Sequence, residues 1–289
     1  MSDDARMEQG LWKARVSDLG WFLVNLFQLL WLGAFTLFCF PPTMLVFAVT
    51  GNHEASFAVG RVFWGPLNMR FGFSSIDVRG KENLPPPGQP YVMMLNHQSM
   101  IDILVVWLIC STGPRFMAKK VLAYVPIVGV FMWAMGMVTI DRSNRHAAIA
   151  ALRRAQAVVK SGHVLCAFPE GTRTRDGQIG PFKKGVFVVA QRSGVPIIPV
   201  AIDGAHILLP RNGWKPRPAV VRVNIGAPIS TATRVRREVL IRQVRDAIID
   251  LHLGIGGPGG NRALAIAGDD DDAEPSGDPR ADGGSPVAA

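Results

Sequence analysis

The feature that most restricts the possible folds of this chain is a stretch without any charged residue, from Leu19 to Asn52. Its first part, Leu19 to Phe40, would form a helix ~33 Å long at ~1.5 Å per residue, enough to cross the hydrocarbon core of a membrane. Pro41 and Pro42 follow, and proline both removes a backbone donor and clashes with the preceding helical turn. We therefore expect the helix to end there. The remaining apolar part, Thr43 to Thr50, is too short to cross back unaided.

Basic residues flank this stretch on both sides, at Arg6, Lys13 and Arg15 before it and at Arg61, Arg70, Arg79 and Lys81 after it. Segments rich in Lys and Arg stay on the cytoplasmic side of a membrane. A two-helix hairpin hinged at the proline pair and embedded in one leaflet satisfies this rule, whereas a single span does not. The prediction is a membrane-associated protein on the cytoplasmic face of the inner cell membrane. The alternative is a buried pair of core helices.

After this stretch, short apolar runs alternate with helical patterns. The predicted strands are one near 76–78 and those at 91–95, 115–118, 138–140, 163–168, 197–202 and 220–225. The main predicted helices are 101–109, 127–135, 145–160, 184–192 and 234–251. Such alternation predicts an α/β fold with a mostly parallel central sheet flanked by helices, to which the N-terminal membrane-embedded hairpin is added. The Arg side of helix 234–251 would face either solvent or anionic lipid.

The predicted organisation has three parts. Residues 1–74 form a membrane-anchoring helical segment, residues 75–253 the α/β domain, and residues 254–289 an acidic tail. The tail is rich in Gly, Pro, Ala and Asp, with four consecutive Asp at 269–272. It offers too little apolar area to offset its chain entropy, so we expect it to be disordered.

Charge and composition narrow the classes of partner. The net charge of +9 and the pI near 10.0 suit nucleic acid, an anionic membrane or a phosphorylated substrate. The aromatic residues cluster in the apolar N-terminus and no nucleic-acid-binding motif occurs, so nucleic acid is not an expected partner. The six His are scattered, which predicts no metal site. The three Cys have no paired spacing and are expected to be reduced, buried thiols.

The segment Asn96–Asp102 carries the strongest chemical signal. His97 and Asp102 are five residues apart, so they would diverge in a regular helix and lie on opposite faces of a strand. They can meet only if the chain turns between an apolar strand ending at Leu95 and a helix beginning at Ile101. A carboxylate beside an imidazole fixes its tautomer and makes it a competent general base. The alternative is a histidine that only caps a local turn.

Further motifs follow in order. Residues 136–142 read Gly-Met-Val-Thr-Ile-Asp-Arg, residues 168–173 read Phe-Pro-Glu-Gly-Thr-Arg, and residues 195–200 read Val-Pro-Ile-Ile-Pro-Val. Together with Asn-His-x4-Asp, this ordered set resembles the glycerolipid acyltransferase family, and within it the 1-acylglycerol-3-phosphate acyltransferases. The resemblance covers roughly residues 75 to 230. It also agrees with a membrane hairpin, because family members carry an N-terminal two-helix membrane element.

The resemblance implies transfer of a fatty acyl group from a thioester to the sn-2 hydroxyl of 1-acylglycerol-3-phosphate (lysophosphatidic acid), giving phosphatidic acid. The donor would be acyl-CoA or acyl-acyl-carrier protein, with no resident cofactor, and membrane lipids would be further partners. Two alternatives are acylation of glycerol 3-phosphate or another lysolipid, and a membrane lipid-binding protein without catalysis.

The roles that follow are these. His97 would act as general base and Asp102 would orient it, with Ser99 weighed as a nucleophile and set aside because it lacks a strained elbow. A backbone N–H near Gly171 would stabilise the oxyanion. Arg173 and Arg142 would bind the phosphate, with Lys119 or Lys120 as a third cation. Glu170 would hold glycerol hydroxyls or orient an Arg, and Thr172 would stabilise the turn.

Overall fold

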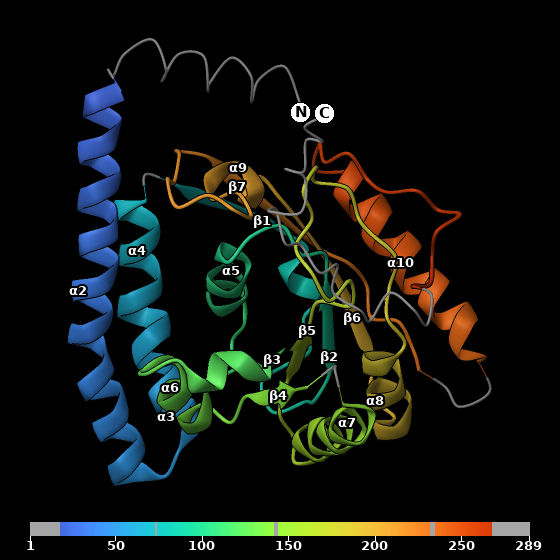
Figure 1. The fold of residues 1–289 in the computed structure, drawn as a ribbon. Helices are drawn as coiled ribbons and strands as arrows, with labels where there is room; N and C mark the ends of the chain where they lie inside the picture. The colour runs from blue at the N-terminus through green and yellow to red at the C-terminus, as the bar shows by residue number, and fades with distance from the viewer. Residues whose placement is uncertain (1–17, 73, 142–143, 232–234, 268–289) are drawn as a thin grey trace, which may run out of the picture.

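The computed structural model describes residues 18–72, 74–141, 144–231 and 235–267 of the chain. The described part contains a seven-stranded sheet in the order β1-β7-β6-β2-β5-β3-β4 (Figure 1). Neighbouring strands are parallel except β6 and β7, which are antiparallel. The strands are β1 Ser75–Arg79, β2 Val92–Leu95, β3 Arg115–Lys119, β4 Val138–Ile140, β5 Leu165–Ala167, β6 Ile197–Asp203 and β7 Val220–Ile225.

Helices connect the strands and cover the sheet. They are α2 Asp18–Thr50, α3 His53–Val59, the π-helical turn η1 Gly60–Trp64, α4 Gly65–Phe71, the short 3₁₀ turn η2 Lys81–Asn83, α5 Ile101–Ile109, the 3₁₀ turn η3 Lys120–Tyr124, α6 Val128–Ala134, α7 Arg145–Lys160, α8 Gly185–Ser193, α9 Ala205–Leu208 and α10 Arg237–Leu253. The predicted α/β fold with a mostly parallel sheet is confirmed, and most predicted elements lie within a few residues of the observed ones.

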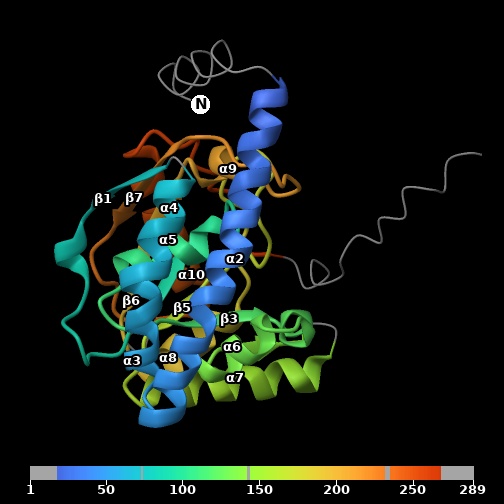
Figure 2. The same cartoon turned by 90° about the vertical axis from the view of Figure 1, so that its left-hand side faces the viewer.

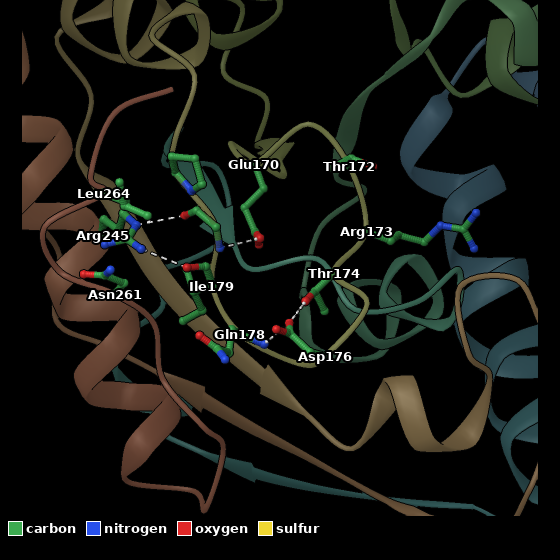
Figure 3. A pocket seen from close by; sticks show the side chains of 12 residues that line it. Glu170, Thr172, Arg173, Thr174, Asp176, Gln178, Ile179, Arg245, Asn261 and Leu264 are labelled. Carbon is green, nitrogen blue, oxygen red and sulfur yellow. Dashed lines mark hydrogen bonds between the residues drawn. The ribbon is translucent and has the colours of Figure 1, made fainter. Parts of the chain in front are cut away.

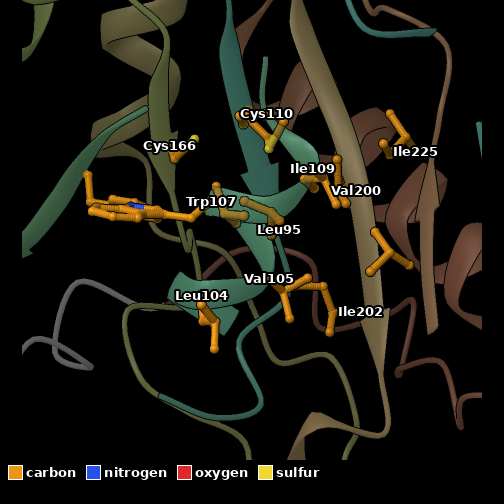
Figure 4. Close-up of a cluster of buried hydrophobic side chains, with 14 of the residues drawn as sticks. Leu95, Leu104, Val105, Trp107, Ile109, Cys110, Cys166, Val200, Ile202 and Ile225 are labelled. Carbon is orange, nitrogen blue, oxygen red and sulfur yellow. The ribbon is translucent and has the colours of Figure 1, made fainter. Parts of the chain in front are cut away.

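Two hydrophobic layers enclose the sheet. All four side chains of β2 are buried, and they alternate between the layers because successive strand residues point to opposite faces. Met93 and Leu95 pack with α5 and its Trp107 in one layer. Figure 4 shows Leu95 and Trp107 in this layer. Val92 and Met94 pack in the other layer, with residues from α7, α8 and α10. Burial on both faces explains why the strand reads as an unbroken apolar run.

The N-terminal helix differs from the prediction at the proline pair. α2 runs without interruption through Pro41 and Pro42 and ends only at Thr50. Gly51, with φ of 61°, and Asn52 make the break, and the Asn52 side chain caps α3 by accepting a hydrogen bond from Glu54 N at 2.8 Å. The prolines are exposed, and the ring contacts Trp31–Phe71 and Phe47–Trp133 hold the helix on either side of them. Packing therefore outweighs the backbone hydrogen bonds that the two prolines remove.

α2 packs antiparallel to α3 and α4 along one side of the molecule (Figures 1 and 2). Two of its buried polar residues bond other parts of the protein, because Asn25 Nδ2 donates to Pro216 O at 2.8 Å and Gln28 Nε2 donates to Phe71 O at 3.4 Å. Its outer face is apolar, with large exposed residues along its length, namely Leu19, Phe22, Leu23, Leu26, Phe27, Leu29, Leu30, Leu32, Leu37, Phe38, Leu45 and Val49. With a mean hydropathy of 1.9, α2 is a candidate membrane anchor.

The C-terminal segment corrects a second prediction. Residues 254–267, expected to be disordered, continue from α10 and pack on the core, with Ile255 and Ala265 buried. The backbone of Phe182 bonds this segment on both sides, donating to Ala265 O at 3.0 Å and accepting from Ala267 N at 3.1 Å. The acidic residues at 269–272 lie outside the described residues. The boundaries at residues 74 and 253 stay predictions.

Candidate active site

The bend between β2 and α5 forms the centre of the site. Asn96 is buried and bonds the backbone of Ile202 in β6 twice, donating to Ile202 O at 2.8 Å and accepting from Ile202 N at 2.7 Å. These bonds extend the β2–β6 pairing by one residue and hold the start of the bend. The chain then turns, and His97 Nδ1 comes within 2.7 Å of Asp102 Oδ2. The predicted meeting of these two side chains is therefore observed.

Asp102 holds both the imidazole and the bend. Its side chain is fully buried in the first turn of α5, and Oδ2 also accepts hydrogen bonds from Gln98 N at 2.7 Å and Ser99 N at 2.8 Å. Because a carboxylate can only accept, His97 Nδ1 must carry the proton. The lone pair then lies on Nε2, the atom that can take up a proton from a reactant.

Glu170 joins two loops to the bend. Its Oε1 accepts from His97 N at 2.8 Å, and its Oε2 accepts from Gly180 N at 2.9 Å. Burial raises the pKa of Glu170 to about 7, although both N–H donors oppose this shift. Glu170 therefore positions the backbone of His97. The two roles that we expected for it, binding glycerol hydroxyls or orienting an Arg, stay predictions.

The imidazole of His97 also has an aromatic neighbour. The ring of Phe168, just before the turn that carries Glu170, stacks on it at a centroid distance of 4.0 Å. The following loop also contacts His97, because Thr174 N donates to His97 O at 2.8 Å. Phe168 is therefore part of the site, although the sequence predicted roles only for the residues that follow Pro169 in this motif.

Arg245 supports the loop on which Glu170 depends. It is fully buried in α10, and its guanidinium donates from Nε to Gly180 O and from Nη2 to Ile179 O, both at 2.8 Å. The expectation that the arginines of this helix face solvent or lipid is wrong for Arg245. A continuous set of hydrogen bonds runs from α10 through residues 179–180 and Glu170 to His97.

A pocket of about 270 Å³ lies beside this set (Figure 3). Glu170 and Arg245 line one part of it, and Asn261 and Leu264 come from the C-terminal segment. His97 does not line the pocket. Glu170 does line it, and it bonds the backbone N–H of His97. Figure 3 shows the Arg173 side chain pointing away from Arg245.

The predicted phosphate-binding residues are distributed over two loops. Arg173 is half-buried, and its carbonyl accepts from Arg211 Nη1 at 2.8 Å. Lys119 ends β3 and Lys120 begins η3, where Lys120 Nζ forms an ion pair with Asp141 at 3.4 Å. Arg142 lies outside the described residues. Gly171 adopts a left-handed φ of 74° in the turn after Glu170, and Thr172 is exposed.

Two further observations refine the site. Ser99 is buried and its hydroxyl donates to Leu209 O at 2.7 Å, which agrees with setting it aside as a nucleophile. A buried polar cluster next to the bend was not predicted from the sequence. In it, Gln98 Nε2 lies 3.4 Å from Asp203 Oδ1 and 3.3 Å from His252 Nε2, and Gln98 Oε1 lies 3.1 Å from His206 Nδ1.

One signal could have revealed Asp203, since it is an acidic residue at the carboxyl end of a buried strand, where ligands of α/β sheets gather. Burial opposes its ionisation, but hydrogen bonds from His252 and Gln98 and the nearby histidine charges outweigh it, so its pKa is lowered. Burial lowers the pKa of His206.

Comparison with known proteins agrees with this geometry. A family model described as "Acyltransferase" matches residues 75–203. The 1-acyl-sn-glycerol-3-phosphate acyltransferase of Saccharomyces cerevisiae is 36% identical over 211 residues, which cover 71% of this chain and 68% of that protein. The chloroplastic 1-acyl-sn-glycerol-3-phosphate acyltransferase BAT2 of Brassica napus is 36% identical over 147 residues, covering 51% of this chain and 42% of that protein.

Among solved structures, the crystal structure of the 1-acyl-sn-glycerophosphate acyltransferase PlsC from Thermotoga maritima superposes with a TM-score of 0.66 at 28% identity, covering 78% of this chain and 92% of that one. The matched region thus spans less than half of the Brassica protein, about two thirds of the yeast protein and nearly all of the solved chain. The resemblance indicated by the four sequence motifs is confirmed. The chain belongs to the acyltransferase family, and it is similar to members of that family named 1-acyl-sn-glycerol-3-phosphate acyltransferases.

Proposed function

We propose that this protein transfers a fatty acyl group from an acyl thioester to the sn-2 hydroxyl of 1-acylglycerol-3-phosphate, giving phosphatidic acid. The observation that carries the proposal is the His97–Asp102 contact of 2.7 Å at the carboxyl end of β2. It supplies the base that an alcohol needs before it can attack a thioester. The names of the relatives support the choice of acceptor.

The reaction follows from the protonation of the pair. Nε2 of His97 takes the proton of the sn-2 hydroxyl as its oxygen bonds to the thioester carbon. Asp102 stabilises the resulting imidazolium, because its Oδ2 accepts the Nδ1 proton. The tetrahedral intermediate then expels the thiolate, which receives the proton from His97 and leaves as a thiol. The substrate hydroxyl is the nucleophile, so no acyl-enzyme is needed.

The remaining roles belong to the same proposal. Arg173 and Arg142 bind the acceptor phosphate, with Lys119 or Lys120 as a third cation, and a backbone N–H near Gly171 stabilises the oxyanion. Thr172 stabilises the turn after Glu170. The donor is acyl-CoA or acyl-acyl-carrier protein, which share the reacting thioester.

The proposal includes the membrane location. α2 is one member of the embedded helical pair on the cytoplasmic face, and the continuous segment from α3 to α4 is the other. The apolar outer face of α2 and the basic residues before and after α2 support this location. Tags before Asp18 and after Phe71, at the two ends of the embedded pair, should both be reached only from the cytoplasmic side. Tags on opposite faces would mean that α2 spans the bilayer.

The activity is tested with purified protein and one acyl thioester, offered a panel of acceptors. The panel contains 1-acylglycerol-3-phosphate, glycerol 3-phosphate, and lysolipids whose phosphate is a diester. Fastest acylation of 1-acylglycerol-3-phosphate at the sn-2 position supports the proposal. Preference for another acceptor would replace the assigned substrate, and no transfer to any acceptor would remove the enzymatic assignment.

Arg173→Ala tests the phosphate site. Loss of a charge-assisted hydrogen bond typically costs ~1.5–3 kcal/mol, which corresponds to roughly 10- to 150-fold in kcat/KM. We expect this loss for 1-acylglycerol-3-phosphate and a much smaller one for a lysolipid without a phosphate monoester. Arg175→Ala is the matched control, because Arg175 is an exposed arginine of the same loop. Equal losses on both acceptors would show that Arg173 supports the fold.

A further inference from the structure

A second exposed apolar surface lies outside α2. It belongs to η3, α6 and the residues between them, and we call it the α6 patch. Its members are large residues with 41% to 72% of their surface exposed, namely Val121, Tyr124, Val125, Val128, Val130 and Trp133. On the other side of α6, Met132 and Ala134 are buried and Phe131 packs against the core. The patch is therefore the outer face of α6 and η3, and the inner face of α6 packs against the core.

The backbone of this element is tightly constrained. Ile127, just before α6, has a φ of 67°, an uncommon conformation for a β-branched residue. Gly129 packs directly on η3, because a Cβ at this position would lie 2.1 Å from Ala123 O. These constraints keep the backbone that carries the α6 patch in one conformation.

The patch continues the outer face of α2. The ring of Trp133 meets that of Phe47 in α2 edge-on at a centroid distance of 5.8 Å. At the start of α3, the His53 ring nitrogen contacts Ala134 O. Figure 2, which looks onto this side of the molecule, shows α2 and α6 side by side. The two elements thus present adjoining apolar surfaces although about eighty residues separate them in sequence.

We propose that the α6 patch is a second membrane-contacting surface, which inserts into the headgroup region of an anionic bilayer beside α2. The proposal rests on the membrane location proposed above. A bilayer contact made only by the N-terminal helices leaves the attached domain free to tilt about that contact. A second contact beside it removes that freedom and fixes which side of the catalytic domain faces the lipid.

The composition of the patch favours a bilayer over a protein partner. Tyr124 and Trp133 are the most exposed members, at 71% and 72%, and these residue types concentrate at membrane interfaces. Lys119 and Lys120 are exposed immediately before the patch, where they can meet anionic headgroups. α6 has seven residues, too few to cross a membrane, so the contact is interfacial.

The insertion is tested by fluorescence quenching in anionic vesicles. The full-length protein carries an environment-sensitive probe on Val130→Cys, and nitroxide-labelled lipids and a soluble quencher are compared. Val239→Cys on α10 is the matched control, since Val239 is 46% exposed and Val130 is 51% exposed. Leu37→Cys on the outer face of α2 reports on the anchor itself. The unsubstituted protein controls for labelling, because its three cysteines are buried.

We expect the lipid quencher to act on the probes at positions 37 and 130 and the soluble quencher to act on the probe at 239. If the probe at 37 responds to lipid and the probe at 130 does not, the α6 patch is not a membrane surface, while the anchor stands. A probe at 130 shielded from both quenchers would assign the patch to a protein contact and also overturns the proposal. If neither 37 nor 130 responds to lipid, the membrane location fails as well.

A second measurement links the patch to activity. Val130→Asp should lower kcat/KM for acceptor in anionic vesicles by about tenfold, because a charge is costly at an apolar membrane contact. With the same acceptor in detergent micelles the change should stay within about twofold. Val239→Asp should leave both values close to those of the unsubstituted protein. Equal loss in vesicles and micelles would contradict a membrane role for the patch.

Discussion

At the scale of single residues, the site uses two buried carboxylates for different purposes. Asp102 contacts the imidazole of His97 and caps the bend, whereas Glu170 bonds the backbone N–H of His97 and does not contact its ring nitrogens in any observed hydrogen bond. Substitution of the first should therefore affect proton transfer directly, and substitution of the second should act through the position of the loop.

His97→Ala should lower kcat by about 10²- to 10⁴-fold, the usual contribution of a general base. The protein should remain folded and should still bind lysolipid, because the bend is held by Asn96 and Asp102. Steady-state acyl transfer and lysolipid binding are measured together. His146→Ala, which changes an exposed histidine of α7, is the control. Activity within about tenfold of the unsubstituted protein would remove His97 from the mechanism.

Glu170 makes the stability of the protein depend on pH. Its pKa rises from an ordinary value of 4.5 to about 7 in the folded state, so the folded protein holds this proton more tightly than the unfolded chain. The resulting contribution, about 3 kcal/mol, is fully present below pH 4.5 and is lost as pH rises through about 7.

Denaturant unfolding at pH 4 and pH 8 checks this expectation. The unsubstituted protein should lose about 3 kcal/mol more stability between these values than Glu170→Gln, in which the group does not ionise. Glu82→Gln, at an exposed glutamate of η2, should behave like the unsubstituted protein. A pH dependence that is unchanged in Glu170→Gln would mean that Glu170 titrates near its ordinary pKa.

The sequence predicted the local part of the site and missed the distant part. The His97–Asp102 contact was predictable because both residues belong to one short turn. The partners of Gln98 were not, since Asp203 and His252 are more than a hundred residues away along the chain. The positions of these residues depend on β6 lying beside β2 and on α10 packing against the sheet. Arg142 lies outside the described residues.

At the scale of elements, packing decided the cases in which local rules failed. Two prolines predicted a break in α2, yet contacts on both sides of them keep the helix continuous. A Gly-rich composition predicted disorder from residue 254, yet the backbone of residues 179–182 offers hydrogen-bond partners that the segment takes up. Neither outcome is visible from composition, because each depends on a surface formed elsewhere in the chain.

Truncation tests the support that residues 255–267 give to the core. Ending the chain after Gly254 removes three backbone hydrogen bonds to Ile179 and Phe182, each worth ~0.5–1.5 kcal/mol. We expect a loss of about 2–4 kcal/mol in the free energy of unfolding and a lower kcat, because residues 179–180 position Glu170. Ending the chain after Ala267 should leave both nearly unchanged. Equal behaviour of the two truncations would contradict a supporting role for residues 255–267.

At the scale of the whole molecule, net charge and apolar surface act together at the membrane. The chain carries a net charge of +9 in addition to the apolar face of α2. Electrostatic attraction extends over ~8 Å at physiological ionic strength and weakens as salt rises, whereas burial of apolar surface does not weaken in this way.

Deleting residues 1 to 52 should therefore change the kind of membrane binding. Each Lys or Arg near an anionic surface contributes ~1 kcal/mol, so the shortened protein should bind anionic vesicles at low salt and leave them at high salt. The full-length protein should stay bound until detergent is added. Vesicle flotation at several salt concentrations measures both, and zwitterionic vesicles serve as the control. Salt-resistant binding of the shortened protein would show that the α6 patch, which lies outside the deleted residues, anchors the domain without α2.

The pairing of β1 with β7 has a consequence for synthesis on the ribosome. β1 lies at the edge of the sheet and β7 is its partner there, with Ser75 opposite Val220. About 145 residues must be translated after β1 before this partner exists, which takes on the order of 10 s at 5–20 residues per second. During that interval the helices from Asp18 to Phe71 and β1 have been translated, while β7 has not. The apolar outer face of α2 is therefore open to a lipid surface or a chaperone before the sheet is complete.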